Sequence, residues 1–257
     1  MEINLNCDLG EKSIHYSGKY DNALLSIINS ANIACGFHAG DKKIIDSTIK
    51  NAKKNNVSIG AHTGFKDLKN FGRKKIFLSK KNLRNLIWEQ LEIINEIAIK
   101  NNTEMTHVKP HGALSNLACE DIEVALTIGE VIKKFNKELI YVVLPLSEME
   151  KASKKLSLKY ACEIFADRNY EDNGQLVSRN KNYALLDDPD IISKNIIKML
   201  NSSSIICFSG KKIKCDIDTI CIHGDNKNSV EIANKLRITL VNNNFNLLKL
   251  NKMLKFT

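Results

Sequence analysis

NIACGFHAGD, residues 32–41, is a short apolar run that ends abruptly in glycine, histidine and aspartate. A strand that breaks into a glycine-flanked turn before a helix is how α/β proteins place reactive groups at the carboxyl end of a strand. The same arrangement recurs at 6–11, 60–62, 109–112 and 223–225. One such turn is weak evidence, but the recurrence predicts a parallel α/β fold with its chemistry at the strand ends.

Short β-like runs alternate with longer helical ones along the whole chain. The apolar spacing predicts strands at 3–7, 33–36, 57–61, 105–108, 139–144, 161–165 and 218–222. It predicts helices at 20–30, 41–55, from 79 onward, and at 120–135, 147–155, 189–200 and 229–241. A hairpin across 205–215 is less clearly marked. With no linker between them, about seven strand–helix units predict a single domain, residues 1–257, built as one closed or nearly closed, TIM-like (β/α) barrel of parallel strands.

The composition excludes several classes of protein. The 38 basic and 29 acidic residues give a net charge of +9, but the lysines are scattered as pairs, whereas a nucleic-acid surface concentrates charge with arginine and aromatic residues. No apolar run approaches the roughly 18 residues of a membrane span, and the first residues do not resemble a signal peptide. The seven cysteines include no Cys-x-x-Cys pair, which argues against disulfides and structural zinc. We expect a cytoplasmic protein that binds neither nucleic acid nor membrane.

Polar residues gather at the predicted strand ends. Because parallel strands all end on one face of a barrel, groups just beyond those ends converge there. Four of the six histidines hold such positions. His15 and His107 do not, and His107 is expected to contact a helix or the barrel interior. The residues predicted to converge, and so to form an active site, are Asp8, Glu11, His38, Asp41, His62, Lys109, His111, Glu163, Asp167, Arg168, His223 and Asp225. The long loop at 63–77 is expected to be functional, because loops of this length in a compact domain usually are, often as lids.

Eight motifs in order also resemble one known family. They are NCDLGE at 6–11, ACGFHAGD at 34–41, GAH at 60–62, FGR at 71–73, VKPHGAL at 108–114, EIFADR at 163–168, GQLV at 174–177 and IHGD at 222–225. Together they resemble the LamB/YcsF family over residues 3 to about 240. The resemblance implies a barrel related to those of glycoside hydrolases and carbohydrate deacetylases. It implies the ATP-dependent opening of 5-oxo-L-proline to L-glutamate, with ADP and phosphate as products, carried out together with subunits B and C.

The chain departs from the family pattern at two places beside the expected site. Thr63-Gly64 stands where family members usually have Pro-Ser, and Ser115-Asn116 stands where they usually have Tyr-Asn. Both changes concern the shape of the substrate pocket and leave every ionisable motif residue in place.

The chemistry of lactam opening suggests classes of role for these residues. Phosphorylating the lactam oxygen turns it into a leaving group, which requires cations around the phosphates and preorganised charge around the developing oxyanion. For the phosphates of ATP the candidates are Lys109 and Arg168, with backbone amides near Gly36, Gly40 and Gly112. The candidates for the base, and for catalysis more generally, are His38, His62, His111, His223, Asp8 and Lys109. The carboxylates of Asp8, Glu11, Asp41, Asp167 and Asp225 either orient the imidazoles or bind Mg²⁺.

Alternatives stay open for several residues and for the function. Asp41 and Asp225 can be helix caps, and Arg168 can form a loop salt bridge. The sequence has no Gly-x-x-x-x-Gly-Lys-Ser/Thr loop, so ATP binds in another kind of site or on a partner subunit. A metal-dependent hydrolase or deacetylase acting alone would use histidines and carboxylates as a three-ligand site with an open position. A third alternative is a non-catalytic scaffold that docks onto an enzyme complex.

Overall fold

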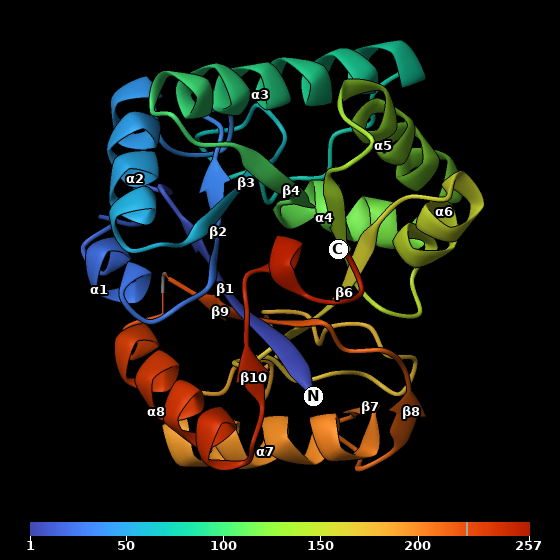
Figure 1. Ribbon diagram of the computed structural model, residues 1–257. Coiled ribbons are helices and arrows are strands. Elements are labelled where there is room, and N and C mark those ends of the chain that lie inside the picture. The colour runs from blue at the N-terminus through green and yellow to red at the C-terminus, as the bar shows by residue number, and fades with distance from the viewer. Residues whose placement is uncertain (225) are drawn as a thin grey trace.

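The computed structural model describes residues 1–224 and 226–257, and its main sheet closes into a barrel (Figure 1). Within those residues the ring order is β1–β2–β3–β4–β5–β6–β9, and β9 pairs in turn with β1. All of these pairings are parallel, so the predicted closed barrel of seven parallel strands is confirmed. The strands are β1 (Glu2–Leu9), β2 (Ser30–Ala34), β3 (Ser58–Thr63), β4 (Met105–Pro110), β5 (Ile140–Val143), β6 (Tyr160–Phe165) and β9 (Thr219–His223).

Helices surround the barrel and bury one apolar face each against it (Figure 1). They are α1 (Asp21–Leu25), α2 (Lys42–Lys54), α3 (Lys80–Lys100), α4 (Gly112–Glu120), α5 (Ile122–Phe135), α6 (Glu148–Leu156), α7 (Pro189–Ser202) and α8 (Ser229–Asn242). Side-chain oxygens of Asp41, Ser79, Asp121 and Asp188 accept hydrogen bonds from the first free amides of α2, α3, α5 and α7. These caps fix where each helix begins, because the first amides of a helix have no partner inside it.

Two predicted helices differ from the structure. The helix predicted at 20–30 ends at Leu25, because the amide of Asn29 donates to the carbonyl of Leu5 and Ser30 already belongs to β2. The helix predicted at 120–135 is preceded by a separate helix, α4, which the sequence pattern did not predict. Asp121 lies between them in an extended conformation and caps α5, so the predicted helix begins at Ile122 and not at Glu120.

The last residues of the chain cover the amino-terminal end of the barrel. β10 (Asn246–Leu247) pairs with the start of β1, and the 3₁₀ helix η1 (Leu250–Lys252) follows. Leu250, Met253 and Phe256 pack against Ile140 and Ala161, near the starts of β5 and β6. Figure 1 shows the C-terminus within the outline of the ring. This end is therefore filled, which leaves the carboxyl ends of the strands for a site.

A small hairpin lies outside the barrel. β7 (Ser204–Ile206) and β8 (Lys212–Lys214) pair antiparallel, which confirms the hairpin predicted at 205–215.

No helix among the described residues has both the length and the apolar character needed to cross a membrane.

Candidate active site

A cavity of about 560 Å³ lies at the carboxyl ends of the barrel strands. Its walls come from β1, β3, β4, β6 and β9 and from the loops that follow them, as expected for a parallel barrel. The ionisable residues at its base are Asp8, Glu11, His62, Lys109, His111 and His223. The sequence prediction of convergence at one mouth therefore holds for these six residues.

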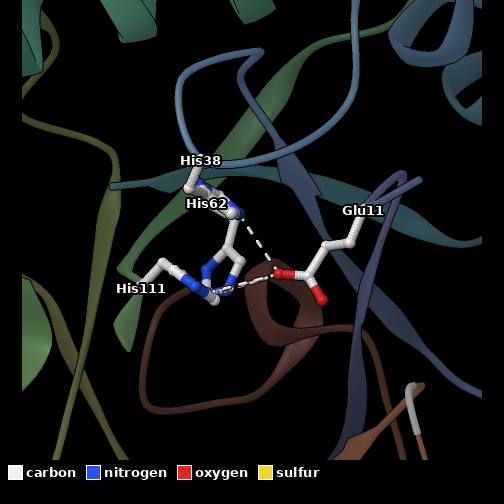
Figure 2. A group of neighbouring side chains, drawn as sticks. All are labelled: Glu11, His38, His62 and His111. Atoms are coloured by element: carbon white, nitrogen blue, oxygen red, sulfur yellow. Dashed lines mark hydrogen bonds and ion pairs between the residues drawn. The ribbon is translucent and has the colours of Figure 1, made fainter. Parts of the chain in front are cut away.

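Glu11 and three histidines form a compact group, here called the histidine cluster: Glu11, His38, His62 and His111 (Figure 2). Their facing ligand atoms all lie within 4.8 Å of one another. Glu11 Oε1 is 3.2 Å from His38 Nε2, 3.3 Å from His111 Nδ1 and 3.7 Å from His62 Nε2. All four residues are buried, so the cluster is held inside the protein and not formed by mobile surface side chains.

Backbone carbonyls fix the orientation of two imidazoles in the cluster. His62 Nδ1 donates to the carbonyl of Lys109 at 2.9 Å, and His111 Nε2 donates to the carbonyl of Phe71, also at 2.9 Å. The remaining nitrogens, His62 Nε2 and His111 Nδ1, face each other at 3.0 Å. The rings of His38 and His111 stack with centroids 3.8 Å apart and planes 7° from parallel.

The loop at 63–77 packs closely over these rings. A Cβ atom on Gly72 would lie 2.8 Å from His38 Cβ, and Gly72 has a positive φ of 63°. A Cβ atom on Gly64 would lie 2.6 Å from His38 Nδ1. Only glycine fits either position without moving the ring, so this loop forms part of the wall of the cluster.

Charges around the cluster set different pKa directions for the three histidines. Burial alone would lower the pKa of His62, but the carboxylates of Asp8 and Glu11 outweigh burial and raise it. Burial lowers the pKa of His38 and of His111 well below the usual range, and neighbouring imidazoles add to the effect. His62 is thus the imidazole whose surroundings favour positive charge.

Beside the cluster, Lys109 lies between two carboxylates. Its Nζ is 2.9 Å from Asp8 Oδ1 and 3.0 Å from Glu163 Oε1. Burial would lower the pKa of Lys109, but the neighbouring Asp8 raises it well above the usual value. Burial would raise the pKa of Asp8, but His62 and then Lys109 lower it well below the usual value. His62 and Lys109 therefore hold Asp8 ionised. The charge of Lys109 is already balanced, which makes it a poor phosphate ligand.

On the opposite side of the mouth, β9 and β6 supply His223 and Asp167. His223 Nδ1 donates to Asp167 Oδ1 at 2.8 Å, and the imidazole stacks on Phe165 with ring centroids 5.0 Å apart. Burial would raise the pKa of Asp167, but His223 lowers it. In the barrel register His223 lies directly beside Asp8, so the two reactive groups are neighbours across β1 and β9.

Several predicted site residues lie elsewhere or do something else. Asp41 is exposed and accepts hydrogen bonds from the amides of Lys43 and Ile44, so it caps α2. The Gly36 amide donates to the carbonyl of Ala39, which leaves it unavailable for phosphate. Of the five carboxylates in the predicted Mg²⁺ set, Asp41 caps α2 and Asp167 pairs with His223. Asp225 lies outside the described residues.

Arg168 and Gly112 keep their place at the cavity. The Arg168 guanidinium donates to the carbonyls of Val177 and Ala184, so it also holds the loop at 169–188. Burial, with Arg179 nearby, lowers the pKa of Arg168 to about 10.

Some residues at the site had no role predicted from the sequence. Arg73 and Arg179 line the cavity together with Arg168. Arg73 belongs to the FGR motif, whereas Arg179 lies in an irregular loop and carries no sequence signal. His107 lies in the barrel interior, where Nε2 donates to Asn32 Oδ1 at 3.0 Å, and Asn32 in turn donates to Asp8 at 2.8 Å.

Together these features define a parallel α/β barrel with a buried, polar, histidine- and carboxylate-lined mouth, the class in which many hydrolases are found. The LamB/YcsF family model matches residues 3–255. The chain belongs to the LamB/YcsF family.

Two relatives and one solved structure match this chain over most of their length. It is 46% identical over 244 residues to the 5-oxoprolinase A subunit of Nitrobacter hamburgensis, covering 95% of this chain and 96% of that one. It is 41% identical over 252 residues to the 5-oxoprolinase A subunit of Clostridium beijerinckii, covering 98% and 99%. The crystal structure of the lactam utilization protein from Thermus thermophilus superposes with a TM-score of 0.90 at 32% identity, over 96% of this chain and 99% of that one.

A more distant similarity concerns the fold alone. The T48 deacetylase superposes with a TM-score of 0.51 at 14% identity, over 99% of this chain and 89% of that one. The barrel architecture is thus shared with a deacetylase, as the family resemblance implies.

Proposed function

We propose that this chain is the lactam-opening subunit of an ATP-dependent 5-oxoprolinase. It acts with subunits B and C on 5-oxo-L-proline and yields L-glutamate, while ATP is hydrolysed to ADP and phosphate. Relatives named as the A subunit of 5-oxoprolinase, at 41–46% identity over nearly the whole chain, support this substrate. The observation that carries the chemistry is the pair of Asp8 and His223, adjacent in register at the base of the cavity.

In this proposal Asp8 takes the proton from the attacking water. Lys109 and Asn32 both donate to its Oδ1, at 2.9 and 2.8 Å, and so hold the carboxylate in one orientation. The water oxygen bonds to the carbon of the phosphorylated lactam and the ring C–N bond breaks, which leaves an acyl phosphate. A second water then hydrolyses this acyl phosphate, and L-glutamate and inorganic phosphate are released. His223, oriented by Asp167 through Nδ1, supplies a proton to the leaving nitrogen from Nε2.

The phosphoryl step makes the lactam oxygen a leaving group. Its transfer from ATP needs cations near the phosphate oxygens, and Arg73, Arg168 and Arg179 line the same cavity. Because the sequence has no P-loop, we place the adenine nucleotide itself on a partner subunit or at the interface with it. The arginines then receive the phosphorylated lactam or the substrate carboxylate.

The function is tested by combining the purified chain with its B and C subunits, ATP and 5-oxo-L-proline, and measuring glutamate and ADP. We expect both products in equal amounts, and neither when this chain or ATP is omitted. Absence of glutamate from the assembled three-subunit mixture would contradict the proposal. Glutamate formed by subunits B and C without this chain would make it a scaffold or an accessory protein.

A second candidate function, a metal-dependent amide or carbohydrate hydrolase acting alone, is favoured by the histidine cluster. Glu11, His62 and His111 resemble the His₂Glu set of zinc hydrolases. This alternative predicts that the isolated chain releases acetate from N-acetylated sugars, or glutamate from 5-oxo-L-proline, without ATP. ATP-dependent turnover only in the presence of B and C would exclude it.

A further inference from the structure

We propose that Glu11, His62 and His111 bind one divalent transition-metal ion through Oε1, Nε2 and Nδ1, and that His38 positions Glu11. The site goes beyond the leading proposal of an ATP-dependent lactam-opening subunit, in which these four side chains have no role, and it does not depend on the stand-alone hydrolase. Figure 2 shows the three imidazoles grouped around one oxygen of the Glu11 carboxylate. The ion would lie at the cavity wall, since all three proposed ligands line the cavity.

The hydrogen bonds of the two imidazoles carry the argument. Backbone carbonyls only accept, so His62 Nδ1 and His111 Nε2, each 2.9 Å from a carbonyl oxygen, both carry hydrogen. A neutral imidazole has one N–H, so the facing nitrogens, His62 Nε2 and His111 Nδ1, both present lone pairs. These lone pairs point at each other across 3.0 Å. Two acceptors at that distance repel unless a cation or an extra proton lies between them.

The carboxylate supports a cation at the same point. Glu11 Oε1 lies 3.3 Å from His111 Nδ1 and 3.7 Å from His62 Nε2. A tetrahedral ion with bonds of about 2.1 Å holds its donor atoms roughly 3.4 Å apart. The three separations in the structure, 3.0, 3.3 and 3.7 Å, lie on both sides of that value. The three donors therefore need only small shifts to surround one ion.

His38 is assigned to positioning because of its ring plane. An imidazole binds a metal through a lone pair in its own plane. The His38 and His111 rings are stacked with centroids 3.8 Å apart and nearly parallel planes, so their in-plane lone pairs cannot meet at one point without ring rotation. His38 also does not line the cavity. Its Nε2 donates to Glu11 Oε1 at 3.2 Å, which fixes the carboxylate.

The donor set selects the class of metal. Two imidazoles and one carboxylate suit Zn²⁺, Fe²⁺ or Mn²⁺, whereas Mg²⁺ prefers oxygen ligands and water. Three protein ligands leave at least one position open toward the cavity, as in catalytic zinc sites. A bound ion would therefore polarise a carbonyl or phosphoryl oxygen of the molecule in the cavity.

Metal analysis tests the site without any turnover. The purified chain is stripped with a chelator, dialysed and titrated with Zn²⁺, with binding followed by calorimetry and elemental analysis. We expect one Zn²⁺ per chain, and a loss of at least about 100-fold in affinity for His62→Ala, His111→Ala and Glu11→Gln, since even residues behind the ligands contribute about 10–100-fold. His38→Ala should lower the Zn²⁺ affinity by only about 10–100-fold. His15→Ala is the matched control, because His15 is exposed and contacts the Lys69 carbonyl outside the cluster.

Thermal unfolding of the native sequence with Zn²⁺ and with chelator keeps the test valid if a variant fails to fold, because a ligand that binds the folded state raises Tm. Less than one Zn²⁺ per chain with no rise in Tm would overturn the site. The positive charge between the two facing nitrogens would then be an extra proton on His62. Equal affinity in His62→Ala and His15→Ala would overturn it as well. Metal binding without 5-oxoproline opening would contradict only the proposed function.

Discussion

The two sides of the barrel mouth are built differently. On the side of β1 to β4, the histidine cluster is almost sealed, with side-chain exposures of 0% for His38, 1% for His62 and 8% for His111. On the side of β6 and β9, His223 is 14% exposed and has one carboxylate partner. Carbonyls, stacked rings and glycine backbones fix the first side, whereas one hydrogen bond and one ring fix the second.

This difference separates two kinds of task. A buried group held by carbonyls and a shared carboxylate suits a ligand that must be held before the substrate arrives. An imidazole with one nitrogen on a carboxylate and the other toward a cavity suits proton exchange. Asp8 lies between the two sides, 3.4 Å from His62 and beside His223 in register. We therefore expect the two sides to respond differently to substitution.

Replacing Asp8 should have the largest effect, because both sides depend on it. Asp8→Asn removes the proposed base and, among residues 1–224 and 226–257, leaves Lys109 with Glu163 as its ion-pair partner. We expect glutamate formation in the three-subunit mixture to fall by about 1,000-fold or more, near the upper range for removal of a general base. Asp41→Asn is the matched control, since an asparagine still caps α2, and its rate should match that of the native sequence. Equal rates for the two variants would exclude Asp8 as the base.

Replacing His223 should separate the two sides. His223→Gln removes the proposed acid, and we expect kcat to fall by about 100-fold. Because this imidazole is partly exposed, the free energy of unfolding should change by less than about 1 kcal/mol, and Zn²⁺ binding should stay as in the native sequence. Kinetics, denaturant unfolding and metal titration of the same preparation measure the three quantities. A parallel loss of Zn²⁺ affinity would show that the two sides are not separate.

The sequence predicted the barrel because its signals are local and repeated. Five of the seven strands, β1, β2, β3, β4 and β9, end in a motif that combines an apolar run with a glycine. The parallel arrangement then places Asp8, His62 and His223 together. Helix α4 escaped prediction, whereas α5 was predicted almost in full; the Asp121 cap separates the two helices.

Roles within the site depended on contacts that sequence spacing does not contain. Asp41 and Glu11 both belong to motifs at strand ends, yet their side chains differ in direction. Asp41 turns back onto its own helix, whereas Glu11 reaches one histidine in β3 and two in the segments that follow β2 and β4. Lys109 looked like a phosphate ligand until its two buried carboxylate partners were placed around it. Side-chain direction at a strand end is set by packing between strands far apart in the sequence, which one strand's motif cannot specify.

Gly64 offers a smaller test of how tightly the cluster is packed. A Cβ atom there would lie 2.6 Å from His38 Nδ1, so Gly64→Ala must displace the ring. We expect a loss of about 2 kcal/mol in the free energy of unfolding, the middle of the range for overpacking a core. In a His38→Ala background the obstructing ring is absent, and the same substitution should cost less than about 0.5 kcal/mol. Urea unfolding of the four proteins gives the coupling energy, and additive effects would contradict the packing account.

The smallest expected effect on stability concerns Asp21, the first residue of α1, which contacts the chain just after β1. Its carboxylate accepts hydrogen bonds from the amide of Gly10, the residue that precedes Glu11, and from the hydroxyl of Tyr16. Burial raises the pKa of Asp21 to about 6, from an ordinary value of 3.8. The folded state therefore holds this proton more tightly than the unfolded chain, so the stabilising contribution is complete below about pH 4 and is lost as pH rises through 6.

Asp21→Asn removes this titration and keeps an oxygen for Gly10. We expect the variant to gain about 1 kcal/mol in free energy of unfolding relative to the native sequence between pH 4 and pH 7, a value reduced by partial solvent screening. Asp46→Asn is the matched control with the opposite sign, because the hydrogen bond from Lys50 lowers the pKa of Asp46 and its contribution is lost as pH falls. Urea unfolding at several pH values measures both. A difference between Asp21→Asn and the native sequence that does not grow with pH would mean that the Asp21 carboxylate is as well solvated as in the unfolded chain.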